Sequence, residues 1–301
     1  MTSPFSVSIR KHTNYSFCRR LKMNKLIITC ALCGAGTKKT MTPYVPVTPE
    51  EIADEVVAVA KAGAAVAHIH VRDEEGNNTM VTEKWVEVID LTRKKMAEAG
   101  VDIVLNLTTS GGKFPEDMRQ AHLPILLPEM CSYDPATMNW ANSYVFLNTP
   151  QFLESLGTLT QELDIKPECE VFDGGTLGNI NYYVKKGFLK TPVHYQFVLG
   201  ASGGMPGNMD SLNYLLPKLP EGATWSITGI GHSHMAYMLL GLANGCDGLR
   251  VGLEDNIYLS KGVLATNVQL VERAIQLAKD CGREIATAED ARQILGLTKH
   301  K

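Results

Sequence analysis

The chain lacks several features that mark large classes of proteins. None of its apolar runs approaches the ~18 residues that a membrane-spanning helix needs. No basic stripe indicates a nucleic-acid surface, and the formal net charge is only -3. No G-x-G-x-x-G follows the first apolar run, which argues against a dinucleotide-binding fold. We therefore expect no nucleic-acid partner and no membrane partner.

A disulfide framework is also missing. The seven cysteines are odd in number and scattered, which favours a reducing compartment, and we expect a cytoplasmic protein. Cys30 and Cys33 have a C-x-x-C spacing, which suits a redox pair or half of a zinc site. No second pair follows them, so buried thiols at the end of a strand are the favoured interpretation.

The first 22 residues differ from the rest in charge. They contain no acidic residue and five basic ones, Arg10, Lys11, Arg19, Arg20 and Lys22. They also lack an apolar h-region, so they do not form a secretory signal. Their composition weakly resembles a transit peptide, but we favour a disordered, non-native leader at residues 1–22. Met23 is then the functional start, and residues 23–301 form a single catalytic domain.

What the chain does contain is a regular alternation of apolar runs and helical patterns. Strands are predicted at residues 26–30, 65–71, 103–109, 125–130, 144–147, 167–173, 195–199, 224–229 and 249–254. Helices are predicted between them, one starting at the capping box Thr48-Pro49-Glu50-Glu51. Strands that alternate with helices pair in parallel through right-handed crossovers. We therefore predict an α/β fold, a (β/α)8 TIM barrel with its active site at the carboxyl ends of the strands.

Three polar residues at strand ends predict a metal site. His68 and His70 lie two residues apart on one strand, so their side chains project to the same face. Glu254 ends the last strand, and alternation aligns it with Arg250 and Gly252. In a closed barrel the second and last strands flank the first, so these side chains can meet. Two imidazoles and a carboxylate form the ligand set of a catalytic zinc site with one open position. The alternative is a structural hydrogen-bond network.

Arg250 and Asp255 flank the predicted carboxylate ligand. A guanidinium beside a carboxylate lowers the pKa of the acid and keeps it ionised. Such a pair can hold a substrate carboxylate, act as a general base, or form a salt bridge at the barrel rim. The glycine-rich stretch at residues 200–207 also follows a strand. Its backbone N–H groups can cradle a phosphate, and a plain tight turn explains the spacing equally well.

Taken together, these motifs resemble the β-keto acid cleavage enzyme family. The resemblance extends from about Leu26 to Leu297. It rests on His68-x-His70-x-Arg72-Asp73, Pro128-Glu129-Met130, Glu168-x-Glu170-x-Phe172-Asp173, Phe197-Val198-Leu199-Gly200, Gly229-Ile230-Gly231, Arg250-Val251-Gly252-Leu253-Glu254-Asp255-Asn256 and Ala286-Thr287.

The resemblance implies a TIM barrel, a homo-oligomer that is usually a tetramer, and a divalent metal, normally Zn²⁺. The implied reaction converts a β-keto acid and acetyl-CoA into acetoacetate and a new acyl-CoA. It implies His68, His70 and Glu254 as metal ligands and Arg250 and Asp255 as the catalytic pair. The residues that it places at the substrates are Thr108, Ser132, Glu170, Gly203 and Gly204.

Two positions depart from the family pattern. Gly36 stands where many members have Glu, so a substrate that bears an amino group has less support. His232 stands where Arg is common, so the contact to CoA is expected to differ.

The runner-up hypothesis is a metal-dependent aldolase or hydrolase that acts on keto acids without CoA. A third is a non-enzymatic binding barrel with a structural His/Glu set.

Overall fold

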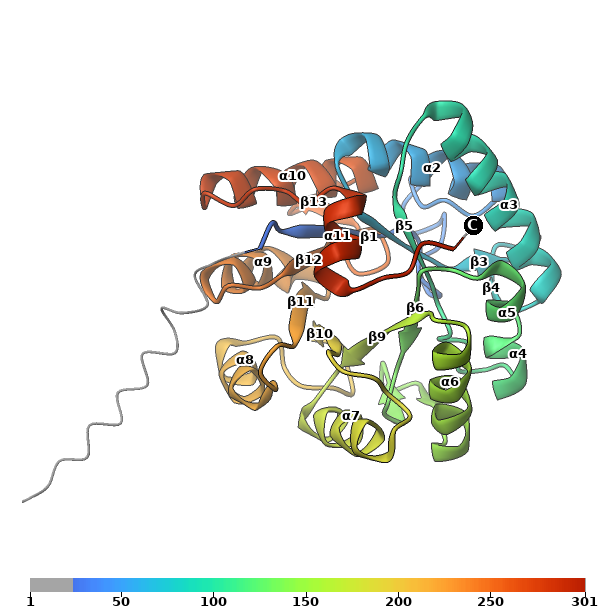
Figure 1. Cartoon of the computed structure of the whole chain (residues 1–301). Helices are drawn as coiled ribbons and strands as arrows, with labels where there is room; N and C mark the ends of the chain where they lie inside the picture. Colours follow the sequence, from blue (N-terminus) through green and yellow to red (C-terminus); the bar gives the residue numbers. More distant parts are fainter. Residues whose placement is uncertain (1–23, 301) are drawn as a thin grey trace, which may run out of the picture.

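Eight parallel strands close into a barrel in this computed structural model, which describes residues 24–300 (Figure 1). The predicted leader at residues 1–22 lies outside the described residues. β1 pairs with β2 on one side and with β12 on the other, so the second and last strands flank the first, as predicted. In order around the barrel the strands are β1 (Ile27–Ala31), β12 (Gly248–Val251), β11 (Thr224–Gly229), β10 (His194–Leu199), β9 (Lys166–Val171), β6 (Met130–Tyr133), β5 (Val104–Leu107) and β2 (Val66–Ile69).

Helices between the strands form the outer layer, which confirms the predicted (β/α)8 architecture. The helix α2 begins at the predicted capping box, where Thr48 Oγ1 accepts from Glu51 N and the Glu51 carboxylate accepts from Thr48 N. In the described part of the chain, no helix combines the length and the apolar character needed to cross a membrane. The helices are α2 (Pro49–Ala62), α3 (Thr82–Ala99), α4 (Glu116–Gln120), α5 (Leu123–Leu126), α6 (Pro150–Glu162), α7 (Gly174–Lys186), α8 (Met209–Leu215), α9 (His234–Ala243), α10 (Asn267–Asp280) and α11 (Ala288–Leu295).

Three short antiparallel pairs stand beside the barrel. They are β3 (Val71–Arg72) with β4 (Asn78–Thr79), β7 (Met138–Trp140) with β8 (Tyr144–Phe146), and β13 (Tyr258–Ser260) with β14 (Val263–Leu264). The strand predicted at residues 144–147 is confirmed as β8, but it pairs with β7 in a separate hairpin and not with a strand of the barrel. The predicted strand at residues 125–130 is wrong. α5 occupies its start, and β6 begins at Met130.

Most apolar side chains on the strands face the helices, and polar side chains fill the interior of the barrel above an apolar layer at its amino end. Cys169 on β9 and Phe197 on β10 belong to the large apolar core, while their neighbours Glu168 and Gln196 are buried with them. Successive side chains of a strand point to opposite faces, so the second set lies inside. Most TIM barrels fill this space with branched aliphatic residues. The buried polar side chains on these strands include Thr29, His68, Asn106, Ser132, Glu168, Glu170, His194, Gln196, Ser226, Thr228 and Arg250.

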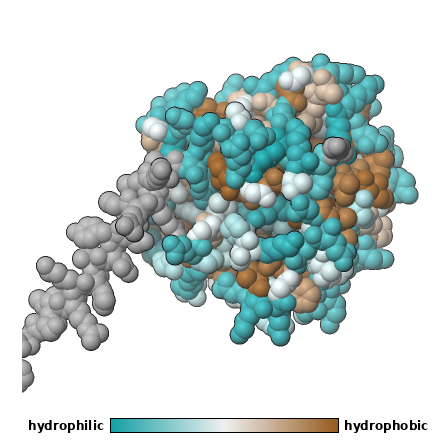
Figure 2. All heavy atoms as spheres, in the orientation of Figure 1, coloured by the Kyte–Doolittle hydropathy of each residue, from teal (hydrophilic) through white to brown (hydrophobic). Residues whose placement is uncertain are grey.

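The amino end of the barrel is closed by α11. Its Ala291 and Leu295 share a buried apolar cluster with Ile27, Val66 and Val104, which lie at the starts of three strands. Figure 1 shows this helix lying across the barrel, and the same face is mostly hydrophilic with smaller apolar areas between (Figure 2). The carboxyl ends of the strands, where the predicted site residues lie, form the opposite end of the barrel.

Candidate metal centre and active site

The structure brings the three predicted metal ligands together. One ligand atom from each of His68, His70 and Glu254 lies within 4.8 Å of the others. The Nε2 atoms of His68 and His70 are 3.7 Å and 3.6 Å from Glu254 Oε2. Both imidazoles are buried, and the Glu254 side chain is 17% exposed. The three groups therefore form one cluster with a partly open side.

Glu254 reaches this cluster through a turn and not through strand alternation, so that part of the prediction is wrong. β12 ends at Val251, and Gly252 has a φ of 138°, which turns the chain out of the strand. A Cβ at Gly252 would lie 2.0 Å from the Ala31 carbonyl oxygen, so only glycine fits there. A hydrogen bond from Glu254 N to Ala31 O, 3.2 Å long, stabilises this turn.

The cluster fits a divalent cation. Glu254 Oε2 is buried and has no hydrogen-bond partner among residues 24–300. Ligand atoms that share one tetrahedral Zn²⁺ lie about 3.3 Å apart, close to the separations seen here. Burial lowers the pKa of His68 to about 3, so its ring is the neutral form that binds metals. Burial alone would raise the pKa of Glu254, but the Arg250 guanidinium outweighs burial and holds that pKa well below its usual value.

Arg250 is the centre of an acidic cluster beside these ligands. Its Nε and Nη2 donate to the two carboxylate oxygens of Asp255 at 2.9 Å and 3.1 Å. Nη1 donates to Glu170 Oε1 at 2.8 Å, and Nη2 donates to Glu254 Oε1 at 2.6 Å. Thr228 Oγ1 donates to Asp255 Oδ2 at 3.0 Å. One guanidinium therefore fixes the predicted base, the predicted metal ligand and the predicted substrate-binding acid in a single arrangement.

The expectation that Arg250 lowers the pKa of Asp255 is wrong in its net result. Burial raises this pKa more than the guanidinium lowers it, so the pKa of Asp255 lies above its ordinary value. The pKa of Glu170 is raised well above its ordinary value for the same reason, again with Arg250 opposing the effect. A carboxylate that is desolvated in this way has a stronger affinity for a proton than a solvated one.

Asp134 is a residue of this cluster that the sequence analysis missed. It follows β6 directly, at the carboxyl end of the strand, which is the position where a barrel carries functional side chains. It is 1% exposed, and Ser110 Oγ donates to its Oδ2 at 2.5 Å. Its Oδ1 has no hydrogen-bond partner in the described part of the chain. Burial raises the pKa of Asp134, and the nearby Glu170 and Arg250 lower it by a smaller amount.

The two hydroxyl residues predicted at the substrate lie side by side. Thr108 follows β5 and Ser132 lies on β6, and their Oγ atoms are 3.5 Å apart. Ser132 Oγ also accepts from Thr109 N at 2.9 Å, which fixes its position. Both are fully buried, at the same end of the barrel as His70 and Asp255.

Gly203 and Gly204 are needed for packing against neighbouring backbone. A Cβ at Gly203 would lie 2.1 Å from Asn139 O in the β7–β8 hairpin. One at Gly204 would lie 2.9 Å from Phe172 O. These contacts account for both glycines without a phosphate, and the contact to CoA stays a prediction.

The loop after β1 is organised by Arg72. This buried side chain donates to the carbonyl oxygens of Cys33 at 2.8 Å and Thr37 at 3.0 Å, and also to Gly34 O. The result is a fixed loop beside Glu254. Cys30 and Cys33 are buried free thiols, as the favoured interpretation of their spacing predicted.

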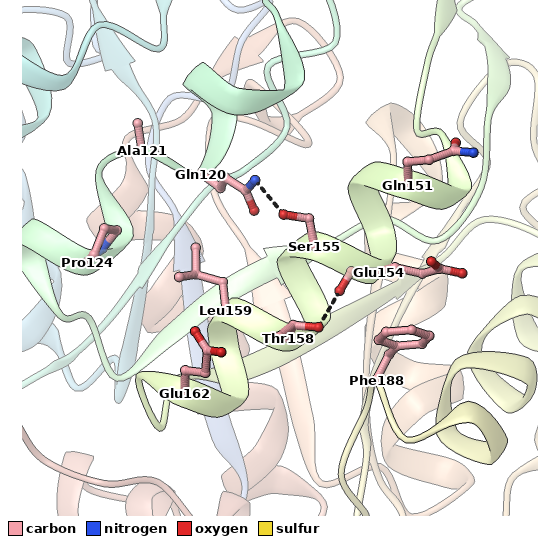
Figure 3. Close-up of a pocket in the computed structure, with 10 residues that line it drawn as sticks. All are labelled: Gln120, Ala121, Pro124, Gln151, Glu154, Ser155, Thr158, Leu159, Glu162 and Phe188. Carbon is pink, nitrogen blue, oxygen red and sulfur yellow. Dashed lines mark hydrogen bonds between the residues drawn. The ribbon is translucent and has the colours of Figure 1, made fainter.

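A surface groove lies away from this site. It has a volume of about 540 Å³ and lies among α4, α5 and α6 on the outside of the barrel (Figure 3). Its polar contacts are ordinary, with Gln120 Nε2 donating to Ser155 Oγ and Thr158 Oγ1 donating to Glu154 O. The chemistry-bearing side chains are at the barrel mouth, so the groove is not the candidate active site.

Comparison with known proteins identifies relatives over nearly the whole chain. The family model described as beta-keto acid cleavage enzyme matches residues 25–297. A 3-keto-5-aminohexanoate cleavage enzyme of Fusobacterium nucleatum subsp. nucleatum is 40% identical over 278 residues, covering 92% of this chain and 100% of the relative. A 3-dehydrocarnitine:acetyl-CoA trimethylamine transferase of Rhizobium meliloti is 38% identical over 302 residues, covering 93% and 99%.

The fold also has a solved counterpart. The ternary complex of ObcA with a C4-CoA adduct and oxalate superposes with a TM-score of 0.73 at 23% identity. The match covers 85% of this chain and 68% of that one. At this identity the likeness supports the barrel architecture alone.

Proposed function

Because the chain belongs to the beta-keto acid cleavage enzyme family, we propose that it is an acyltransferase that cleaves a β-keto acid with acetyl-CoA. The products are acetoacetate and a new acyl-CoA. The observation that carries this proposal is the convergence of His68, His70 and Glu254 beside the Arg250–Asp255 pair at the barrel mouth. Such a site combines a metal-ligand set with a candidate base in one buried cluster.

We assign His68, His70 and Glu254 as the residues that hold the cation, and two nitrogens with one carboxylate oxygen suit Zn²⁺. When bound, a divalent cation there polarises a carbonyl oxygen and stabilises negative charge that develops on it. The charge of the cluster supports this assignment. Glu254, Asp255 and Glu170 all bond to the one guanidinium of Arg250, so a cation at Glu254 adds positive charge beside these acids.

Asp255 is assigned as the general base. Desolvation gives its carboxylate a raised proton affinity, and Arg250 and Thr228 hold it in one orientation. It removes a proton from carbon 2 of the β-keto acid. That carbon then forms a bond to the acetyl carbonyl carbon, and the CoA thiolate leaves. The thiolate attacks carbon 3, the bond between carbons 2 and 3 breaks, and carbon 2 takes the proton back from Asp255. Acetoacetate and the new acyl-CoA result.

The neighbouring side chains are assigned to the substrates. Thr108 and Ser132 offer hydroxyl groups, and Glu170 offers a carboxyl group, all buried at the mouth. Gly203 and Gly204 belong to the loop that we expect beside CoA. The names of the relatives give different substrates, 3-keto-5-aminohexanoate and 3-dehydrocarnitine, so the test uses a panel of keto acids.

The test is an assay with acetyl-CoA and a panel of β-keto acids, in which mass spectrometry detects acetoacetate and the new thioester. Product formation that persists without CoA would favour the runner-up, an aldolase or hydrolase. Asp255→Asn should reduce kcat by about 10²–10⁴-fold while the bound metal is retained. The matched control is Asp117→Asn, which changes an exposed carboxylate on α4 and should leave kcat unchanged.

The oligomeric state and the compartment belong to the same proposal. We propose a homo-oligomer, by similarity to the family, and a cytoplasmic location, since the buried free cysteines suit a reducing compartment. Sedimentation equilibrium of the purified protein tests the first, and fractionation of cells tests the second.

A further inference from the structure

The two histidines of the metal site differ in how their second ring nitrogen is held. A histidine that binds a metal through Nε2 keeps its proton on Nδ1, and that N–H requires an acceptor. His70 has one, because its Nδ1 lies 3.2 Å from Asn78 Oδ1 on β4. His68 is 1% exposed, and its Nδ1 has no hydrogen-bond partner among the described residues. A buried donor without an acceptor is costly.

Asn106 supplies the matching acceptor. It is fully buried on β5, and the barrel register pairs it directly with His68 on β2. Neighbouring strands lie about 4.8 Å apart, so the two inward side chains are adjacent. Asn106 Oδ1 likewise has no hydrogen-bond partner within residues 24–300. One residue thus has a buried donor without an acceptor, and its neighbour has a buried acceptor without a donor.

Glu168 fixes the direction of the Asn106 amide. Asn106 Nδ2 donates to Glu168 Oε2 at 2.6 Å. The two ends of an amide point apart, and Glu168 on β9 lies on the opposite side of β5 from β2. Oδ1 is therefore directed toward the strand that carries His68.

Glu168 is itself held inside the barrel. Its Oε1 is 3.8 Å from His194 Nε2. The His194 ring is in turn fixed by Thr224 Oγ1 at 2.9 Å and Ser226 Oγ at 3.1 Å. A continuous row of buried polar side chains therefore runs from β11 through His194, Glu168 and Asn106 to the ligand.

We propose that Asn106, held by Glu168, is a positioning residue for the metal site. Its Oδ1 accepts the Nδ1–H of His68 and fixes the ring so that Nε2 faces the cation. This inference rests on the proposed role of His68 as a ligand. Loss of such an outer partner weakens metal binding by about 10–100-fold.

The experiment measures the Zn²⁺ Kd of the full chain by competition with a chromogenic chelator. Asn106→Leu keeps the volume of the side chain and removes both hydrogen bonds, so the Kd should rise about 10–100-fold. The visible spectrum of the Co²⁺-loaded variant should also change. The matched control is Asn244→Leu, the same substitution at a half-buried amide outside the barrel, which donates to Leu240 O at the end of α9. Its Zn²⁺ Kd should equal that of the parent chain.

A rescue pair separates positioning from folding. Asn106→Asp alone sets two carboxyl groups against each other and should weaken Zn²⁺ binding. Adding Glu168→Gln reverses the donor and the acceptor, because the new amide donates to one oxygen of the new carboxylate while the other oxygen faces His68. The double variant should regain the parent Kd or bind more tightly. If it does not, or if Asn106→Leu binds Zn²⁺ as tightly as the parent, the inference is overturned.

His68→Ala distinguishes failure of this inference from failure of the proposed site. If the parent chain binds Zn²⁺ no more tightly than His68→Ala, the assignment of the ligand itself is wrong. If His68→Ala loses the metal and Asn106→Leu does not, only the role of Asn106 fails. Where Asn106→Leu does not fold, by circular dichroism, the rescue pair decides.

Discussion

Buried ionisable side chains in this protein take the protonation state that their immediate neighbours dictate. His68 and Glu254 lie within 4 Å of each other, yet burial holds the imidazole neutral while Arg250 keeps the carboxylate ionised. This is the pair of states in which both groups bind a metal. The neighbours within the cluster, more than the intrinsic acidity of each group, therefore determine whether these side chains can bind a metal.

His122, between α4 and α5, shows the same effect and gives a pH prediction. It is fully buried, its ring stacks on Trp85 with 4.3 Å between centroids, and neither ring nitrogen has a hydrogen-bond partner in residues 24–300. Burial lowers its pKa to about 3, against an ordinary value of about 6.5. Below pH ~6.5 the unfolded chain binds a proton that the folded chain does not bind until about pH 3. The free energy of unfolding should therefore fall as the pH falls through this range.

His122→Phe keeps the stacked ring and removes the titration. Its free energy of unfolding should fall by on the order of 2 kcal/mol less than that of the parent chain between pH 6 and pH 4. Urea denaturation at a series of pH values measures this. Equal pH dependence in the two proteins would show that His122 is not held neutral in the folded state.

For individual site residues, the sequence predicted those that stand at strand ends, and it missed those that are defined by contacts between strands. His68, His70, Arg250 and Asp255 stand out because polar groups follow apolar runs. Asp134 carried the same signal and was overlooked. Asn106 is one polar residue within an apolar strand, and its pairing with His68 depends on a register that the sequence does not state.

Among the larger elements, the loop after β1 controls the position of Glu254. Gly34 has a φ of 59°, and a Cβ there would lie 2.5 Å from Glu254 Cγ. Gly34→Ala should therefore displace the ligand and weaken Zn²⁺ binding by about tenfold or more, measured by chelator competition. Gly36→Ala is the matched control in the same loop, because its Cβ would have no atom within 4 Å. Equal Zn²⁺ affinity in the two variants would contradict the prediction.

Arg292 adds ion pairs to the apolar cluster and to the Lys25–Asp290 ion pair that hold the helix α11 on the barrel. Arg292 Nε and Nη2 donate to both oxygens of Glu129 at 2.6 Å and 2.9 Å, and its Nη1 donates to Asp102 Oδ2 at 2.6 Å. Arg292→Ala should reduce the free energy of unfolding by about 3 kcal/mol. Arg292→Lys should recover little of this, because an ammonium cannot bind two carboxylates in the planar, bidentate way.

Urea denaturation of both Arg292 variants measures this loss. Since α11 lies at the closed end of the barrel, kcat of the folded variants should be close to that of the parent chain. A Lys variant as stable as the parent would show that charge alone, without the bidentate geometry, holds the helix.

The sequence predicted the strands of the barrel best where long helices with a clear apolar periodicity separate them. The strand β8 was predicted, but its partner was not, because a short run of alternating residues does not indicate which strand it pairs with. The segment at residues 125–130 was assigned as a strand because a short apolar run has no period that distinguishes strand from helix. Glu254 was placed on a strand, although the φ of Gly252 ends the strand three residues earlier.

For the whole molecule, the metal site joins strands from both ends of the chain, so its occupancy should affect global stability. Zn²⁺ at 100 times its Kd should add about 2.7 kcal/mol to the free energy of unfolding. Removing the metal with a chelator should therefore lower the Tm by several degrees, and adding Zn²⁺ back should restore it. Differential scanning fluorimetry checks this. His68→Ala should show no such response, and a Tm that is insensitive to metal in the parent would contradict the prediction.

The (β/α)8 architecture followed from strand alternation and from the family resemblance together. The polar interior of the barrel did not, because it depends on which face of each strand turns inward. Glu168 and Gln196 become core residues only once the strands close around them.

The position of α11 has a practical consequence. The chain leaves the barrel at the end opposite the mouth, behind a helix that plugs the first turns of the strands. A solid support or a fused domain joined beyond this helix would hold the molecule by its base. The reactive end would then stay turned toward the flowing solution, so immobilisation from this side should leave access for a ligand as bulky as a coenzyme.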